Sequence, residues 1–162
     1  MENRIKVTGI AYQRHIAKIT LRDVPDKPGL AGSLFEPLTD DGISVDTIVQ
    51  NTSADKLTDI SFTVDQKDLP ATLLTLEKIP SVLSSGKLLS EENLAMVSIV
   101  GSGMQNTPGY ASKMFTILAK GNINIDMITT SEIRISCIIS EDSLENAVQL
   151  LHQGFELDRI VN

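Results

Sequence analysis

The sequence of 162 residues predicts an α+β fold built from two ferredoxin-like β-α-β-β-α-β units in tandem. Three observations carry this prediction: an internal repeat, the same order of strand and helix signals in each copy, and an additional strand-like segment at residues 5–11. Copy 2 has no convincing last strand after Gly154, so we expect the N-terminal segment to complete it. The expected domains are residues 16–92, and residues 5–12 together with 93–162.

The repeat appears when residues 17–53 are set against residues 97–133 without a gap, a shift of 80. Nine of the 37 positions are then identical, which is well above chance. After Ser53 the shift falls to 75, because copy 2 lacks the five residues 54–58 of copy 1. The identities are Ile19/Ile99, Pro28/Pro108, Gly29/Gly109, Ala31/Ala111, Phe35/Phe115, Leu38/Leu118, Ile43/Ile123, Asp46/Asp126 and Ile48/Ile128.

The first half of each copy is a strand, a Pro-Gly loop and a helix. Short β-branched runs at residues 19–21 and 97–100 predict the strands. Apolar residues then recur at helical spacing, and Gly42 and the Gly121-Asn122 pair should end the helices. Pro37 lies inside the first helix and should kink it, because it removes a backbone donor. The helical positions are Leu30, Leu34 and Leu38 in copy 1, and Ala111, Met114, Phe115 and Leu118 in copy 2.

The second half of each copy predicts two strands and a second helix. Asp68 and Ser143 are suitable N-caps for the second helices. The strands are expected at 43–49, 59–64 and 86–89 in copy 1 and at 123–128 and 133–139 in copy 2, and the helices at 68–79 and 143–153.

Composition excludes several classes of function. Fourteen Lys and Arg against 21 Asp and Glu give a net charge of −7, which disfavours nucleic-acid binding. Cys137 is the single cysteine, so the chain has no internal disulfide and no cysteine-based metal site. The sequence has no apolar run of membrane-spanning length and no signal-peptide core, so we expect a cytoplasmic protein without membrane contact. His15, expected in a polar turn, and His152 have no neighbours that indicate catalysis or metal binding, and no cofactor is expected.

The loop between the first strand and the first helix of copy 1 is the best candidate for binding chemistry. Amide groups at a helix N-terminus suit an anion, and Gly29 permits close approach to the backbone. Asp26 places a carboxylate beside that anion site, which together fit the two charges of an amino acid. Gln50, at the end of the neighbouring strand, would reach such a ligand from the side. On spacing alone, a plain Asp-Pro-Gly turn is the favoured explanation of the loop.

Motifs along the whole chain resemble those of ACT domains, the amino-acid-sensing modules of metabolic enzymes. The chain as a whole resembles the regulatory β subunit of aspartate kinases, or the C-terminal regulatory region of full-length ones. That family nests one ACT domain inside the other, in agreement with the strand count. The matching segments, in order, are 7–11 (VTGIA), 26–29 (DKPG), 49–51 (VQN), 58–63 (TDISFT), 101–104 (GSGM), 108–109 (PG) and 130–136 (TSEIRIS).

The resemblance implies a regulatory module without a catalytic site, which mediates feedback inhibition of the kinase at the first step of the lysine, threonine and methionine pathway. It also implies a threonine site, with lysine as a second effector, formed between ACT domain 1 of one chain and ACT domain 2 of a partner in a homodimer. A catalytic kinase subunit or domain is the further partner. The effector residues are Asp26, Lys27, Pro28, Gly29, Leu30 and Ala31, flanked by Gln50, Asn51 and Ser53, with Asn124, Ile125 and Asp126 from the partner chain.

By symmetry the resemblance implies a second site around the Pro-Gly loop of copy 2. Asn106 stands where copy 1 has Asp26, and a neutral amide holds an ammonium less well than a carboxylate does. We therefore rank the copy 1 site first and leave open whether the copy 2 loop is only structural. The residues of the second site are Asn106, Thr107, Pro108, Gly109, Tyr110 and Ala111, with Ser44, Val45 and Asp46.

Three other interpretations were weighed. Gly101-Ser102-Gly103 follows a strand, but the dinucleotide fingerprint would need a glycine at Asn106. The small regulatory subunit of acetolactate synthase has a similar length, but it lacks two copies at this spacing. An enzyme of the acylphosphatase type would need an arginine in a phosphate-binding loop, and neither Pro-Gly loop contains one.

Overall fold

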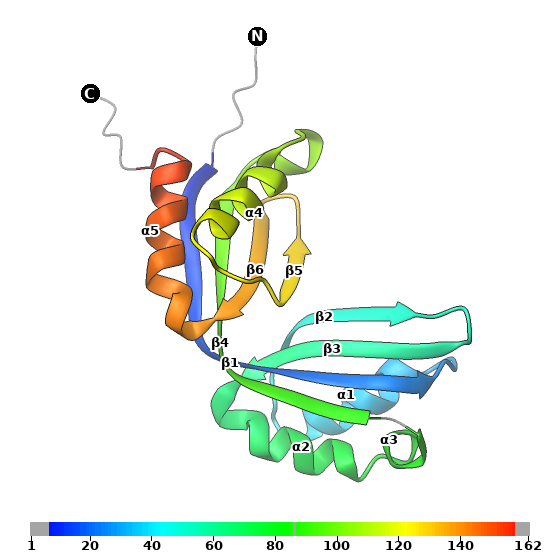
Figure 1. Ribbon diagram of the computed structural model, residues 1–162. Coiled ribbons are helices and arrows are strands. Elements are labelled where there is room, and N and C mark those ends of the chain that lie inside the picture. The colour runs from blue at the N-terminus through cyan, green and yellow to red at the C-terminus, as the bar shows by residue number, and fades with distance from the viewer. Residues whose placement is uncertain (1–6, 86, 158–162) are drawn as a thin grey trace. The chain divides into compact units, whose positions relative to one another are not determined.

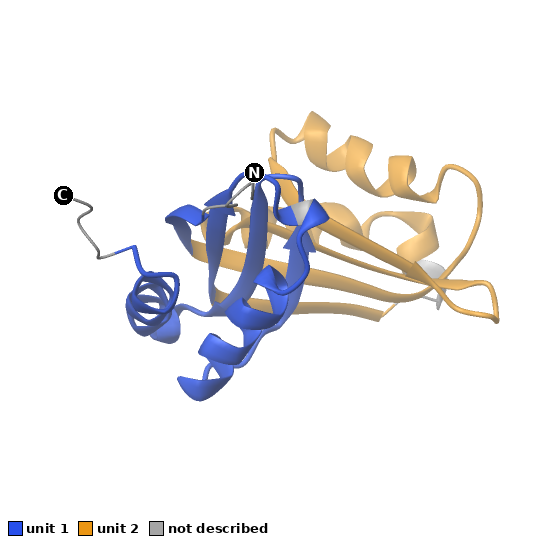
Figure 2. Cartoon of the chain, turned by 90° about the horizontal axis from the view of Figure 1, so that it is seen from above, with its two compact units in different colours: residues 1–14, 94–162 blue, residues 15–93 orange. Residues whose placement is uncertain are grey.

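The computed structural model describes residues 7–85 and 87–157, and the chain divides into two compact units. Unit 2 comprises residues 15–93, and unit 1 comprises residues 1–14 and 94–162 (Figure 2). Each unit has the β-α-β-β-α-β elements of a ferredoxin-like ACT fold, so the predicted fold class is confirmed (Figure 1).

Unit 2 contains four strands and the helices that cover one face of them. The strands lie in the order β2-β3-β1-β4, which is the ferredoxin-like order of fourth, first, third and second strand read from the other edge. The elements are β1 (Val7–Pro25), α1 (Leu30–Asp40), β2 (Val45–Thr52), β3 (Leu57–Asp65), the 3₁₀ turn η1 (Gln66–Asp68), α2 (Leu69–Glu77), α3 (Pro80–Ser85) and β4 (Lys87–Gly101).

Unit 1 repeats this arrangement with the order β1-β4-β6-β5, in which β1 stands in the place of the fourth strand. Residues 7–14 of β1 lie beside β4, where the Thr8 hydroxyl donates to the Val100 carbonyl at 3.3 Å. The prediction that the N-terminal strand completes copy 2 is therefore confirmed from Val7 onward; residues 5 and 6 lie outside the described residues. The remaining elements are η2 (Met104–Asn106), α4 (Tyr110–Lys120), β5 (Met127–Thr130), β6 (Arg134–Ser140), η3 (Glu141–Ser143) and α5 (Leu144–Gly154).

β1 is one strand of 19 residues that contributes to both units (Figure 1). The predicted polar turn around His15 was wrong: His15 lies within β1, although its φ of 57° is left-handed. β4 also passes from one unit into the other, and it too contains a left-handed residue, since Asn93 has φ 58°. The side chain of Gln66 holds Asn93 from both sides, accepting from its amide at 2.9 Å and donating to its side-chain oxygen at 3.3 Å.

Each unit has its own hydrophobic core between sheet and helices. In unit 2, Leu34 and Leu38 of α1 and Phe62 of β3 are fully buried, and the rings of Phe62 and Phe35 meet edge to face at 5.1 Å. In unit 1, Met114 and Leu118 of α4 pack in a cluster with Cys137 of β6, which confirms that this thiol is buried. Pro37 lies inside α1, as predicted.

The first helices end as predicted, at a left-handed residue. Gly42 (φ 73°) and Asn122 (φ 56°) each allow the next amide to turn back, so that Ile43 donates to the Leu38 carbonyl and Ile123 to the Leu118 carbonyl, both at 2.9 Å. Because of these bonds, the next strand of each unit begins later in the sequence than predicted. β2 begins at Val45 and β5 at Met127, later than the expected 43 and 123.

Asp68 and Ser143 stand at the N-cap positions of the second helices, as predicted, but neither acts as a side-chain cap. The side chains of Asp68 and Ser143 make no capping hydrogen bond, because a 3₁₀ turn precedes each helix. In unit 2 it is the Asp65 carboxylate that accepts from the Lys67 amide, at 3.1 Å, at the start of this turn.

The strand register corrects the ungapped repeat. Thr20 faces Ser61 across β1 and β3, and Ser98 faces Ser136 across β4 and β6, so the first strands correspond with a shift of 78 rather than 80. Two additional residues therefore lie in the loop of unit 1. A shift of two keeps every side chain on the same face of a strand, so the hydrophobic pattern could not reveal the slip.

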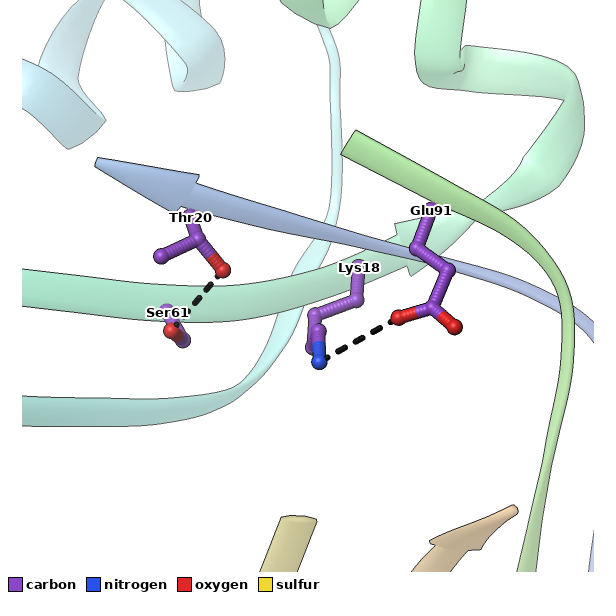
Figure 3. Close-up of polar contacts among 4 residues, drawn as sticks. All are labelled: Lys18, Thr20, Ser61 and Glu91. Atoms are coloured by element: carbon purple, nitrogen blue, oxygen red, sulfur yellow. Dashed lines mark hydrogen bonds and ion pairs between the residues drawn. The ribbon is translucent and has the colours of Figure 1, made fainter. Parts of the chain in front are cut away.

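The strand face opposite the helices carries polar pairs in both units. In unit 2 the hydroxyls of Thr20 and Ser61 are 3.1 Å apart, and Lys18 Nζ lies 3.4 Å from a Glu91 carboxylate oxygen (Figure 3). In unit 1 the hydroxyls of Ser98 and Ser136 are 2.6 Å apart and buried.

Candidate effector-binding site

The loop of residues 26–29 leads from β1 into α1 in unit 2 and ends on a left-handed glycine. Gly29 is the N-cap residue, with φ 86°, and its carbonyl accepts from the Ser33 amide at 3.0 Å. The Leu30 amide donates to the Lys27 carbonyl at 3.1 Å, which closes the turn. No side chain caps this helix at Gly29, so the first-turn amides that follow Leu30 have no side-chain cap.

The hairpin turn between β2 and β3 supports this loop. The Asp26 amide donates to the Lys56 carbonyl at 3.0 Å, while the Asp26 side chain is exposed. Lys56 is positioned by its own amide, which donates to the Ser53 carbonyl at 3.1 Å. The structure thus brings Asp26 and Ser53 together through Lys56, one of the five residues that copy 2 lacks.

The register of β2 separates the other two predicted flanking residues. Gln50 is opposite Ile60, which is buried in the core, so Gln50 lies on the helix side of the sheet. Asn51 is opposite Asp59 and lies on the other face. A ligand at the helix side of the sheet would meet the side chain of Gln50 but not that of Asn51.

A pocket of about 440 Å³ adjoins the loop on the side of α3. Its walls include the predicted residues Lys27, Pro28, Gly29 and Leu30, but not Asp26, Gln50 or Asn51. Sequence reasoning missed its other lining residues, Pro25, Ser33, Pro80 and Ser81. No motif marks these four residues, and only a comparison of the two repeats in space shows why they leave a pocket.

The corresponding loop of unit 1 is filled by the protein's own side chains. It contains the short turn η2 and left-handed glycines at Gly103 (φ 71°) and Gly109 (φ 103°). Met104 from this turn is buried in the core, and Tyr110 stacks on Phe155 at 6.5 Å. Asn106 and Pro108 are exposed, and Thr107 and Ala111 are half-buried.

The strand segments that were expected to close the two sites have parallel roles. The Asp46 carboxylate accepts from the Thr47 amide at 2.8 Å, at a bulge where Thr47 has φ 42°. Asp126 is tied to β6, because its amide donates to the Ile138 carbonyl at 2.8 Å. Ser44 and Asn124 are exposed, and Val45 and Ile125 are half-buried.

The remaining candidate groups indicate no catalytic chemistry. Burial raises the pKa of the Cys137 thiol from 9.0 to about 12, which keeps it protonated, and its Sγ lies 4.0 Å from the Met114 sulfur. Within residues 7–85 and 87–157, no three His, Cys, Asp or Glu side chains cluster as a metal site would require. None of the helices in that same part of the chain is long and apolar enough to cross a membrane.

Comparison with known proteins gives two ACT-domain matches, one to residues 19–81 and one to residues 97–155. The regulatory subunit of aspartate kinase from Thermus thermophilus, in its ligand-free form, shares 39% identity and a TM-score of 0.83. The match covers 92% of this chain and 98% of that subunit. The chain belongs to the family of aspartate kinase regulatory subunits.

Other members of the family agree with this assignment. A structure of aspartokinase alpha and beta subunits matches with 41% identity and a TM-score of 0.83, over 93% of this chain and 99% of that one. Aspartate kinase Ask_LysC of Stutzerimonas stutzeri is 47% identical over 152 residues, which is 94% of this chain. The chain spans 37% of the length of that curated relative and corresponds to the regulatory part of such enzymes. An acetolactate synthase subunit is therefore set aside.

Proposed function

We propose that the chain senses threonine, with lysine as a second effector, and thereby mediates feedback inhibition of an aspartate kinase. The effector would bind at the loop of residues 26–31, in ACT domain 1 (residues 16–92). Asn124, Ile125 and Asp126 of a second copy, in ACT domain 2 (residues 5–12 and 93–162), would close the site. The proposal includes a homodimer, a catalytic kinase subunit or domain as partner, and a cytoplasmic location.

The observation that carries this proposal is the open loop of unit 2 beside an exposed carboxylate. The first-turn amides of α1 that follow Leu30 would take the α-carboxylate of threonine, because no side chain at Gly29 caps them. Asp26, held by Lys56, would take the α-ammonium group through a charge-assisted hydrogen bond. Gln50 and Ser53 would meet the side of the ligand.

The mechanism is a shift between two arrangements of the dimer. An effector bound between two chains stabilises the arrangement in which both halves of its site are in place. The kinase partner would respond because its activity depends on that arrangement. The family match to a regulatory subunit supports this coupling, since such a subunit acts through a partner.

Calorimetric titration of the full chain with threonine, lysine and both together tests the proposal. We expect saturable threonine binding that Asp26→Ala abolishes and Gln50→Ala weakens to a smaller extent. Asn106→Ala, the matched change in unit 1, should leave the affinity for threonine unchanged. Unchanged affinity for threonine in a folded Asp26→Ala variant would refute the site. Absence of binding in all three titrations would refute the proposed effectors.

A further inference from the structure

The pocket of about 440 Å³ beside α3 in unit 2 is lined in part by residues whose repeat counterparts in unit 1 have larger side chains that contact one another. Leu30, Ser33 and Pro80 line the pocket. With the shifts of 80 for the first helix and 75 for the second, their counterparts are Tyr110, Lys113 and Phe155. In unit 1 the rings of Tyr110 and Phe155 stack with an angle of 7° between their planes.

In unit 1 a lysine side chain also packs against these rings. Lys113 Nζ lies 4.8 Å from the centroid of the Phe155 ring, a cation–π contact over the stack. Unit 2 has neither ring, because leucine and proline replace tyrosine and phenylalanine, and serine replaces the lysine. The Ser33 hydroxyl instead donates to the Leu30 carbonyl at 2.7 Å, which keeps it against α1 rather than across the pocket. Both units therefore have the helix pair, but unit 2 lacks the large side chains that pack at its end in unit 1.

The lining of the open pocket has a definite chemistry. Pro25, Pro28 and Pro80 give it rigid apolar walls, and Leu30 forms its buried floor. Lys27 supplies the one charged group among the lining residues, and it is a cation. The volume falls in the range of about 300–1,000 Å³ that is typical of small-molecule sites.

We propose that this pocket is a second small-molecule site of the chain, and that its ligand carries a flat apolar ring and a carboxylate. The ring would take the place that Phe155 occupies in unit 1, against Leu30 and Pro80. The carboxylate would pair with Lys27. The pocket shares the loop residues 27–30 with the proposed threonine site, but neither Asp26 nor Gln50 lines it, and its remaining walls lie outside that site.

The test uses 3-phenylpropionate as the probe and the full chain labelled with ¹⁵N. Titration should give saturable amide shifts at Gly29, Leu30, Ser33 and Ser81. 3-Phenylpropanol, which has the ring but lacks the charge, should bind about tenfold more weakly, as expected for loss of one charge-assisted contact. The double variant Ser33→Lys/Pro80→Phe introduces two of the side chains of unit 1 and should weaken 3-phenylpropionate at least about tenfold by filling the pocket.

The double variant is expected to fold, because unit 1 accommodates these side chains at the positions that correspond in the repeat. Its thermal midpoint should equal or exceed that of the parent chain, since a cavity is filled. Absence of saturable shifts in the parent chain would overturn the inference, as would shifts that persist unchanged in the folded double variant. Asp26→Ala separates the two proposals, because Asp26 does not line the pocket: this variant should lose threonine binding and keep the affinity for 3-phenylpropionate.

Discussion

The two units have the same fold but treat the loop before their first helix in opposite ways. In unit 2 the loop is four residues long, is supported by the hairpin turn at Lys56, and leaves a pocket beside it. In unit 1 the loop between β4 and α4 is residues 102–109, eight residues long, and Met104 and Tyr110 pack around it. The comparison indicates that the loop of unit 2 borders open space, whereas the loop of unit 1 is packed by side chains of its own unit.

The largest expected effect distinguishes the two cores at one equivalent position. Phe62→Ala should cost about 3–5 kcal/mol, because it leaves a large cavity and removes the contact with Phe35. Cys137→Ala, at the same place in unit 1, should cost only about 1 kcal/mol, since it removes one atom. Urea unfolding of both variants measures the loss of unfolding free energy in each. Equal losses would show that the two cores are not packed as differently as these side chains imply.

The second effect is a pH dependence that only unit 1 can show. The Cys137 thiol has a pKa raised to about 12 by burial, so the native state keeps its proton while the unfolded state loses it above 9.0. The unfolded state then binds fewer protons, and stability falls as pH rises from 9.0 towards 12, by at most about 1.4 kcal/mol per pH unit.

Urea unfolding at pH 8.0 to 10.5, taken at roughly half-unit steps, should therefore show a steeper decline in the parent chain than in Cys137→Ala. The variant controls for every other group that titrates in this range. Parallel curves for the two proteins would mean that the thiol is not shielded from water. Thiol-specific reagents should likewise react with Cys137 only after unfolding.

The third effect concerns threonine binding, and it distinguishes the need for a carboxylate from the need for open space at the two loops. Asp26→Asn should weaken threonine binding by about tenfold to a hundredfold, equal to about 1.4–2.7 kcal/mol, because the ammonium group loses its charged partner. Asn106→Asp gives unit 1 the same charge but should not create a second site, since Met104 and the ring of Tyr110 fill the space there. Calorimetry that finds a second binding event in Asn106→Asp would contradict the filled loop.

The fold could be predicted from the sequence because the chain contains two copies of the same pattern of strands and helices. The repeat gave the element order, and the unassigned N-terminal strand indicated that β1 completes unit 1. The slip of two residues in the first strand could not be predicted, since Ile19 matches Ile99 in sequence while it corresponds to Val97 in space. The N-cap positions Asp68 and Ser143 were predicted, but the 3₁₀ turn before each second helix, and with it the lack of a side-chain capping bond, was not.

The candidate site was predictable only in part, for a related reason. Asp26 and Gly29 are marked by the Pro-Gly loop itself. The opposite faces of Gln50 and Asn51 follow from strand register, which the sequence does not reveal. The pocket walls at Ser33 and Pro80 are defined by what is missing relative to Lys113 and Phe155, and this absence has no motif.

The fourth effect concerns the hydroxyl pairs on the strand face away from the helices. Ser98→Ala should cost about 1–2 kcal/mol, because it leaves the buried Ser136 hydroxyl without its partner at 2.6 Å. Thr20→Val, at the equivalent place in unit 2, should cost less than about 1 kcal/mol, since that pair is longer, at 3.1 Å, and only partly buried. In unfolding experiments, the double changes Ser98→Ala/Ser136→Ala and Thr20→Val/Ser61→Ala should recover part of each loss. If Thr20→Val costs more than Ser98→Ala, burial does not set the strength of these pairs.

The smallest effect belongs to an ion pair that unit 2 has and unit 1 lacks, since Met96 takes the place of Lys18 there. Lys18 Nζ and the Glu91 carboxylate are 3.4 Å apart, and the glutamate side chain is 51% exposed (Figure 3). Water and salt screen such a pair, so Glu91→Gln should lower the unfolding free energy by no more than about 0.5 kcal/mol. The loss should vanish in about 1 M salt, where the screening length is about 3 Å. The neighbouring Glu92→Gln, also exposed, is the matched control, and it should change nothing in either buffer. A loss for Glu91→Gln that survives high salt would mean that Lys18, whose side chain is only 18% exposed, depends on Glu91 for its burial rather than for a surface attraction.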